Sequence, residues 1–254
     1  MKRQMTMLMV RAAVTAVLTT IAWGQTPPPQ AAPPSGRGPA AAGQSRQTDW
    51  AALARYRDDN AKVAPPAKGE NRVVFMGDSI TDFWPRNVEQ FFPGKPYIGR
   101  GIGGQTTPQM LVRFQQDVVA LQPKVVVINA GTNDIAGNTG PSTLEMIEDN
   151  LKSMAQIAMA NGIKVVLASV TPAYDYPWKR GIEPAEKIVT LNAWMKTWCA
   201  QHGCVYCDYF SGLTDEKHGM KEAYSADGVH PNAAGYAVMQ PIAEKAIAEA
   251  LAKK

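Results

Sequence analysis

The sequence predicts an α/β fold, a flavodoxin-like three-layer α/β/α sandwich around a five-stranded parallel sheet of strand order 2-1-3-4-5. Short runs rich in β-branched residues alternate with longer amphipathic stretches from about residue 50 onward. Such alternation is typical of a parallel sheet covered by helices on both faces. Glycine-rich and polar motifs follow the predicted strands, and open parallel sheets bind ligands outside the carboxyl ends of their strands. About 200 residues suffice for one domain with a full core.

The individual elements follow from the spacing of the apolar residues. Runs of four to seven residues rich in Val and Ile predict strands, and amphipathic stretches of ten or more predict helices. The predicted strands are Arg72–Met76, Pro96–Gly99, Val125–Ala130, Lys164–Val170 and Val205–Tyr209. The predicted helices are Trp50–Ala61, Asp82–Phe92, Pro108–Leu121, Ser142–Asn161, Pro184–Gln201 and Asn232–Ala252.

Residues 1–24 have the pattern of a signal peptide. Lys2, Arg3 and Arg11 precede a mostly apolar run from Ala12 to Trp23, and no acidic residue occurs in this segment. This arrangement is typical of secretory signals, and the apolar run is too short to span a bilayer. We expect cleavage near Gly24 and export of a bacterial protein to the periplasm or the medium, with no integral membrane segment left. No cysteine lies near the site to accept a lipid.

The next segment, residues 25–47, is composed mainly of Pro, Ala, Gly, Ser and Gln, which predicts a disordered spacer before a domain of residues 48–254. Without the signal peptide the chain has 23 Lys and Arg against 22 Asp and Glu, a net charge of about +1. No basic cluster is interleaved with aromatic residues, so we expect no nucleic-acid partner. The sequence carries no signal for an oligomeric state.

Three cysteines lie in one short region, at Cys199, Cys204 and Cys207. Export favours a disulfide, and Cys199 with Cys204 is the first pairing to test because Gly203 lets the chain turn between a helix and a strand. The odd number leaves one thiol free. A zinc site is the alternative, but His202 is the one candidate for a fourth ligand beside the three cysteines, and we expect neither a metal nor a cofactor.

Four short blocks contain the groups that an acyl-transfer site needs. They are Gly77-Asp78-Ser79-Ile80-Thr81, Gly101-Ile102-Gly103-Gly104-Gln105-Thr106-Thr107, Gly131-Thr132-Asn133-Asp134 and Asp227-Gly228-Val229-His230-Pro231. A nucleophilic serine requires a base, a carboxylate that orients the base, and hydrogen-bond donors for the oxyanion. Ser79, His230 and Asp227 can fill the first three roles, and Gly104 and Asn133 can supply donors beside the Ser79 N–H.

The predicted topology brings these blocks together. Ser79 follows the first strand, Gly104 the second and Asn133 the third, so the order 2-1-3-4-5 gathers them at one crevice. Asp227 and His230 come just before the last helix. Because residues three apart on a helical turn share a face, we expect this carboxylate to hold the imidazole from such a turn.

The four blocks resemble those of the SGNH hydrolases, also called GDSL esterases and lipases, over essentially residues 48–254. The residues that name this family match Ser79, Gly104, Asn133 and His230. The resemblance implies a serine nucleophile, an oxyanion hole made by the Ser79 and Gly104 N–H groups and the Asn133 side chain, and an Asp227 carboxylate that orients the histidine. Ile80 stands where the family usually has Leu, an apolar replacement. Residues 99–107 are similar to the subgroup of platelet-activating-factor acetylhydrolase subunits and small carbohydrate esterases.

Other interpretations of the same residues are weaker. Ser79 could cap a helix, which is compatible with a catalytic role. Thr81 stands where a Gly-x-Ser-x-Gly elbow needs its second glycine, which disfavours an α/β-hydrolase. Residues 99–104 match a dinucleotide-binding Gly-x-Gly-x-x-Gly, but the next strand ends in Asn129-Ala130, without an acidic residue for a ribose, and that fingerprint normally follows the first strand. Asp78 is expected to brace its loop by accepting backbone N–H bonds.

Aromatic residues near the predicted site are candidates for a substrate rim, with a place in the core as the alternative. They are Trp84, Tyr174, Tyr176 and Trp178. The sequence thus predicts an exported serine esterase that removes small acyl groups, acetyl above all, from small-molecule or carbohydrate esters through an acyl-enzyme. A lysophospholipase or thioesterase is the first alternative. The second is an inactive carbohydrate-binding or envelope protein on the same scaffold.

Overall fold

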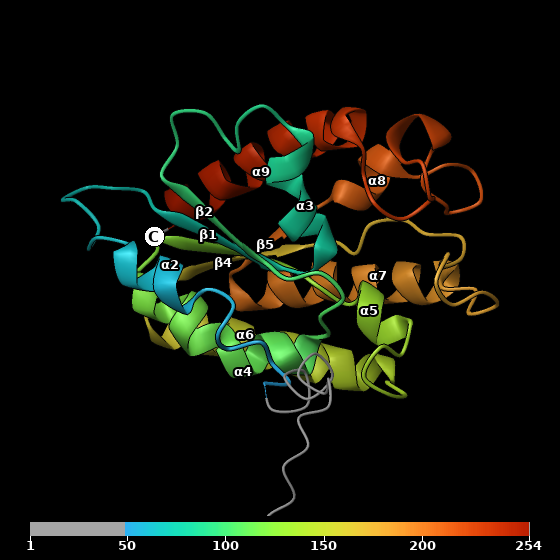
Figure 1. The fold of residues 1–254 in the computed structure, drawn as a ribbon, viewed down its shortest axis with the longest axis horizontal. Helices are drawn as coiled ribbons and strands as arrows, with labels where there is room; N and C mark the ends of the chain where they lie inside the picture. Colours follow the sequence, from blue (N-terminus) through green and yellow to red (C-terminus); the bar gives the residue numbers. More distant parts are fainter. Residues whose placement is uncertain (1–48, 254) are drawn as a thin grey trace, which may run out of the picture. The chain divides into compact units, whose positions relative to one another are not determined.

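The computed structural model describes residues 49–253, and within them five parallel strands form a single sheet (Figure 1). The strands are β1 (Val73–Gly77), β2 (Tyr97–Gly101), β3 (Val125–Asn129), β4 (Lys164–Ala168) and β5 (Val205–Cys207). Their order is β2-β1-β3-β4-β5, and every neighbouring pair is parallel. The predicted α/β fold and strand order are therefore confirmed. The predicted signal peptide and spacer lie outside the described residues.

Helices cover both faces of this sheet, as Figure 1 shows. One face carries α3 (Ser79–Asn87), α8 (Tyr209–Leu213) and α9 (Ala233–Ala252), and the other carries α4 (Thr107–Asp117), α6 (Leu144–Ala160) and α7 (Ala185–His202). The short helix α2 (Arg57–Lys62) packs against α4, and α5 (Thr132–Ile135) follows β3. Two 3₁₀ turns are Val119–Leu121 and Glu222–Tyr224. None of the helices among the described residues is long and apolar enough to cross a membrane.

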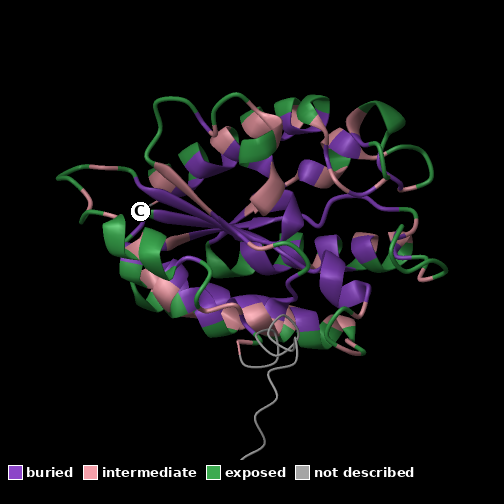
Figure 2. Ribbon diagram, in the orientation of Figure 1, coloured by how far each residue is buried: buried purple, intermediate pink, exposed green. Residues whose placement is uncertain are grey.

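Successive strand residues supply two separate cores. Val73 and Phe75 of β1 point into the core under α3 and α9, whereas Val74 and Met76 point into the core under α4, α6 and α7. Strands β1 and β3 are buried at every position, which Figure 2 shows as purple at the centre of the sheet. A central parallel strand faces helices on both sides, and this explains why these runs are continuously apolar.

The element boundaries differ from the sequence predictions in two instructive places. The first helix begins at Arg57 and not at Trp50, because the Asp49 carboxylate accepts hydrogen bonds from the N–H groups of Leu53 (2.7 Å) and Ala54 (2.9 Å) and holds this segment in turns. Helix α3 spans Ser79–Asn87 and not Asp82–Phe92, because Asp78 caps it by accepting the Ile80 N–H at 3.0 Å. Strand ends differ by one or two residues. Helices α5 and α8 are too short for periodicity to reveal.

The disulfide between Cys199 and Cys204 is present, as predicted. Gly203 ends α7 in the left-handed conformation, at a φ of 76°, and turns the chain into β5. Cys207 is free and buried. The bonded sulfurs are not available as thiolate ligands, and the described residues contain no group of three or more His, Cys, Asp and Glu side chains placed to hold a metal ion.

We expect the disulfide to be detectable by counting thiols. Unfolded but unreduced protein should react with one equivalent of Ellman's reagent, and reduced protein with three, because the chain has three cysteines. Closing this short loop should stabilise the fold by about 2 kcal/mol, so Cys199→Ser/Cys204→Ser should lose that amount in urea unfolding. Three reactive thiols before reduction would contradict the pairing.

Candidate active site

Ser79 is the first residue of α3, directly after β1 and the single residue Asp78. The turn is so tight that a Cβ at Gly77 would overlap the Thr81 side chain and lie 2.9 Å from the Asn129 carbonyl oxygen. Glycine is therefore required before the serine. The position at a helix N-terminus gives Ser79 the positive end of the helix dipole, which favours negative charge on its oxygen.

The serine, histidine and aspartate candidates form a hydrogen-bonded chain. Ser79 Oγ lies 2.9 Å from His230 Nε2, and His230 Nδ1 lies 2.7 Å from Asp227 Oδ2. The predicted helical turn is wrong, because residues 225–231 form a loop that ends before α9. The second carboxylate oxygen, Asp227 Oδ1, accepts the backbone N–H groups of His230 (2.8 Å) and Val229 (2.9 Å) and so folds this loop. One carboxylate thus shapes the loop and orients the imidazole.

Asp227 is held in its ionised form. Partial burial on its own would raise the pKa of this carboxyl, but hydrogen bonds from the His230 side chain and from the backbone of His230 and Val229 lower it to about 2. The Ser225 hydroxyl also donates to Asp227 Oδ1 at 3.1 Å. An ionised Asp227 accepts a hydrogen from Nδ1, which leaves His230 Nε2 free to accept the Ser79 proton.

The oxyanion-hole candidates meet at the same place. Gly104 and Asn133 line a hollow of about 270 Å³ together with Ser79 and His230; we call it the catalytic hollow. Gly104 has a φ of 79°, a conformation that favours glycine. Asn133 Nδ2 donates one hydrogen bond to the Gln105 carbonyl at 3.0 Å. Its second hydrogen bond, to Asp78 Oδ2, is long, at 3.4 Å. The second hydrogen of this amide is therefore weakly engaged and available to an oxyanion.

Asn138, which the sequence analysis did not identify, holds the Asn133 amide in place. Its Nδ2 donates to Asn133 Oδ1 at 2.8 Å, and its Oδ1 accepts the Trp178 indole N–H at 3.3 Å. Because the first bond fixes which end of the Asn133 amide is oxygen, it turns the Nδ2 group toward the site. Asn138 lies outside the four blocks, so no motif marked it.

Two buried carboxyl groups brace the motifs. Asp78 accepts the Ile80 N–H, as predicted for it, and burial raises its pKa to about 7. A carboxyl that keeps its proton near neutral pH places less negative charge beside an oxyanion. Asp134 accepts the Thr107 N–H with both oxygens at 3.0 Å, so it joins the third block to the start of α4. Burial raises the pKa of Asp134 as well.

A buried arginine, Arg113 of α4, ties the first two blocks together. Its guanidinium donates to the Gly77 carbonyl (3.1 Å), to Gln105 Oε1 (2.6 Å) and to Asp117 Oδ2 (3.1 Å). Its side chain and that of Asp117 are wholly buried. The arginine therefore fixes the end of β1, two residues before the serine, to the residue that follows Gly104.

The predicted aromatic rim is only partly correct. Trp84 is 2% exposed and packs against Phe75, Phe92 and Tyr236 in the core, so its assignment to substrate binding is wrong. Its position in α3 points it back toward the sheet. Phe83, the preceding residue, lines the catalytic hollow instead, with its ring centroid 5.3 Å from that of His230.

The three aromatic residues after β4 have different environments. Trp178 is 42% exposed and lines the catalytic hollow. Tyr176 is fully buried and stacks behind it, with ring centroids 5.0 Å apart, so it supports Trp178 and cannot contact a substrate. Tyr174 is exposed but does not line the catalytic hollow.

The glycine-rich segment does not form a dinucleotide fingerprint. Gly99 and Gly101 lie within the edge strand β2, and a Cβ at Gly101 would collide with the backbone of α3.

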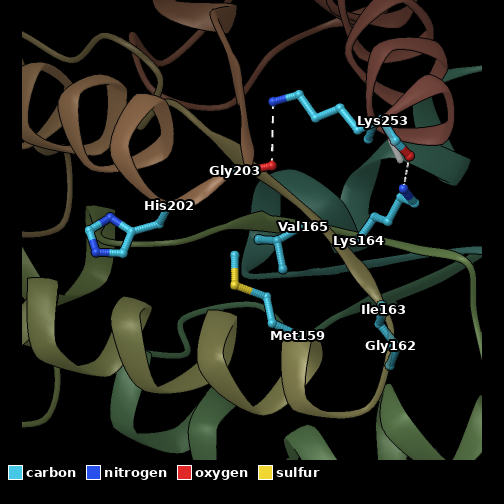
Figure 3. A pocket seen from close by; sticks show the side chains of 9 residues that line it. Met159, Gly162, Ile163, Lys164, Val165, His202, Gly203 and Lys253 are labelled. Atoms are coloured by element: carbon cyan, nitrogen blue, oxygen red, sulfur yellow. Dashed lines mark hydrogen bonds between the residues drawn. The ribbon is translucent and has the colours of Figure 1, made fainter.

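Another hollow, of about 280 Å³, lies where β4 begins, at the opposite end of the strand from the motifs (Figure 3). It is lined by Lys164, His202 and Lys253, and the Lys253 ammonium is engaged by the carbonyls of residues 203 and 204.

Residues 75–238 match the model of the GDSL-like lipase/acylhydrolase family. The chain belongs to this family. It is a GDSL-type carboxylic ester hydrolase, and the predicted superfamily is confirmed. The match covers most of the described domain and includes all four blocks.

Relatives of this GDSL hydrolase include esterase TesA of Pseudomonas aeruginosa, 31% identical over 64% of this chain and 77% of that protein. The match to the uncharacterised lipoprotein YqeF of Bacillus subtilis is 36% identical over 31% of this chain, and spans only 33% of that protein. A solved structure from Bacteroides fragilis, provisionally described as an acylhydrolase, is 45% identical, with a TM-score of 0.78 over 80% of this chain and 98% of its own.

More distant structures share the fold alone. A Streptococcus pneumonia protein provisionally described as a platelet activating factor is 24% identical, with a TM-score of 0.66 over 80% of this chain and 93% of its own. A variant of an acetylxylan esterase from Geobacillus stearothermophilus is 19% identical, with a TM-score of 0.57 over 73% and 96%.

Removing the side chain of Asn138 should slow catalysis. We expect Asn138→Ala to lower kcat for p-nitrophenyl acetate about tenfold, because the Asn133 amide loses a bond worth about 1.4 kcal/mol in its orientation. Asn161→Ala, at the end of α6, is the matched control. An unchanged kcat in Asn138→Ala would show that the amide is held without it.

The depressed pKa of Asp227 should appear in the pH dependence of stability. The ionised group stabilises the native state fully above its unfolded pKa of about 3.9, and this contribution disappears as the pH falls toward the folded pKa of about 2. Because the side chain is 39% exposed, screening reduces the effect to about 1 kcal/mol. The stability difference between wild type and Asp227→Asn in urea should therefore shrink by about this amount between pH 5 and pH 2. A constant difference would contradict the assignment.

Proposed function

We propose that this GDSL hydrolase is an exported serine esterase that removes acetyl and other small acyl groups from carbohydrate esters through an acyl-enzyme intermediate. The observation that carries the proposal is the hydrogen-bonded chain from Ser79 through His230 to Asp227, with distances of 2.9 and 2.7 Å. Such a chain is the arrangement that nucleophilic catalysis by serine requires.

In the first half-reaction, Ser79 Oγ attacks the ester carbonyl carbon as His230 Nε2 takes the hydroxyl proton. The carbonyl π electrons move onto oxygen, and the resulting oxyanion accepts hydrogen bonds from the N–H groups of Ser79 and Gly104 and from Asn133 Nδ2. The intermediate then re-forms its carbonyl and the ester C–O bond breaks. The departing alcohol oxygen receives the proton from Nε2, and the acyl group remains on Ser79.

In the second half-reaction, water enters the site that the alcohol has left. His230 Nε2 removes a proton from this water, whose oxygen attacks the acyl carbon. The second tetrahedral intermediate uses the same oxyanion donors, and its collapse returns the proton to Ser79 Oγ and releases the acid. Ionised Asp227 stabilises the imidazolium that exists during both halves, and no cofactor takes part in either.

The form of the catalytic hollow supports a short acyl group. Its volume is about 270 Å³, and the rings of Phe83 and Trp178, which both lie close to the His230 ring, line it. A long acyl chain gains affinity by burying its methylene groups, which a small open hollow does not provide. This argument favours acetyl over the long chains of a lysophospholipase or thioesterase.

Export is supported by two independent features. Residues 1–24 have the composition of a signal peptide. The disulfide between Cys199 and Cys204 belongs to an oxidising compartment such as the bacterial periplasm or the medium. A relative that is described as a lipoprotein agrees with export.

The proposed chemistry predicts the outcome of an ester series. Wild type should hydrolyse p-nitrophenyl acetate with the highest kcat/KM among esters of two to sixteen carbons, and Ser79→Ala should lose at least 1,000-fold in kcat, as expected when a nucleophile is removed. Asp227→Asn should retain binding and lose kcat. An optimum at long chains would move the substrate to lipids, and turnover by Ser79→Ala equal to wild type would exclude this nucleophile.

The inactive-scaffold alternative makes the opposite prediction. A carbohydrate-binding protein would turn over none of the esters and would bind its sugar equally well as wild type and as Ser79→Ala. Calorimetry on both proteins, beside the ester assays, separates the two functions.

A further inference from the structure

A second hollow adjoins the catalytic hollow. It has a volume of about 560 Å³ and shares Gly103, Gly104 and Asn138 with its neighbour. Trp50 and Gln109 lie on its far side. The two hollows are therefore direct neighbours, with the oxyanion-hole glycine in the wall of both. We call the second hollow the outer lobe.

The outer lobe combines an aromatic face with polar groups. The Trp50 side chain is 49% exposed, and the amides of Gln109 and Asn138, the hydroxyl of Thr139 and the carboxylate of Asp49 surround it. An exposed indole beside groups that both donate and accept hydrogen bonds suits the apolar face and the hydroxyls of a sugar ring. These groups already have partners within the protein, but the oxygens of a carboxylate, an amide and a hydroxyl each have a second lone pair, which a sugar hydroxyl can use and a hydrocarbon chain cannot.

The segment that carries Trp50 is fixed to the domain. Gln109 Nε2 donates to the Trp50 carbonyl at 2.6 Å, Gln105 Nε2 donates to the Ala51 carbonyl at 2.8 Å, and Gln116 Nε2 donates to the Leu53 carbonyl at 2.8 Å. In Figure 1 this blue segment runs beside α4 before α2. The indole is thus presented by an anchored backbone, which reduces the entropy that binding would cost.

The charge of the residues that line the two hollows disfavours phosphate-bearing alcohols. Among the described residues, no Lys or Arg lines the catalytic hollow or the outer lobe. Hydrogen bonds from the backbone N–H groups of Ala54 and Leu53 lower the pKa of Asp49, so this group is negative at neutral pH. The charge of Arg57 also lowers the pKa of Asp49, but Arg57 does not line either hollow. The Asp49 carboxylate disfavours a lipid phosphate and accepts hydrogen bonds from neutral hydroxyls.

We propose that the outer lobe binds a second sugar unit of an oligosaccharide ester, whose ring lies on the indole of Trp50. The ester-bearing unit lies against Trp178 in the catalytic hollow, and the chain passes over Asn138, which lines both lobes and bonds to the Trp178 indole. This inference rests on the proposed esterase function and adds that the substrate has at least two neutral sugar units.

The test compares substrates of different length in matched variants. The substrates are p-nitrophenyl acetate and acetylated β-1,4-linked sugars of one, two and three units. In wild type, kcat/KM should rise about tenfold from one unit to two, the gain expected for an aromatic contact. In Trp50→Ala the ratio of kcat/KM for the disaccharide to that for p-nitrophenyl acetate should fall about tenfold, mainly through KM. Trp50→Phe should restore most of this ratio.

Control variants and outcomes separate the two proposals. Met146→Ala removes another exposed apolar side chain, on α6 and away from both lobes, and should keep the wild-type ratio. If wild type cleaves p-nitrophenyl acetate but shows no gain with a second sugar, or if Trp50→Ala keeps the wild-type ratio, the subsite is refuted and the esterase stands. If wild type cleaves no ester at all, the esterase and the subsite both fail.

Discussion

The buried guanidinium of Arg113 is the interaction on which the geometry of the site depends. It joins the carbonyl at the end of β1, the side chain that follows Gly104, and the Asp117 carboxylate, all within the core. Removing one partner of a buried ion pair leaves an uncompensated charge, which costs about 3–5 kcal/mol. These bonds keep the loop after β1 and the loop after β2 at a constant separation, so the serine and its oxyanion donors stay in register.

Three carboxyl groups hold the remaining motifs in position, each through different hydrogen bonds. Asp134 holds the N-terminus of α4 against the third block, Asp78 caps α3, and Asp227 folds the loop that presents His230. Of these three carboxyl groups, Asp227 is the one with a lowered pKa, since it alone is partly exposed and receives several N–H groups together with an imidazole. The negative charge of Asp227 therefore lies at the far end of the hydrogen-bonded chain from the oxyanion.

The strand order that gathers the motifs also places the two hollows beside the edge of the sheet. Strand β2 is the edge of the sheet, so the loop after it borders the catalytic hollow on one side and the outer lobe on the other. The segment before α2 closes the far wall, because glutamines of the second block and of α4 bind its carbonyls. Two half-exposed tryptophans, Trp50 and Trp178, thus line neighbouring hollows that share the loop after β2 and Asn138.

The sequence by itself determined the fold class, the strand order and the candidates Ser79, Gly104, Asn133, Asp227 and His230, because apolar periodicity and short motifs are local properties of the chain. A glycine between a helix and a strand made Cys199–Cys204 the first pairing to test, and the structure contains that disulfide. Tertiary structure decided what depends on distant neighbours. Trp84 is in the core and Phe83 faces the site because one residue along a helix changes the face by about 100°. Asn138, Arg113 and Trp50 acquired their roles only through contacts that link separate parts of the chain, and such contacts leave no pattern in the sequence.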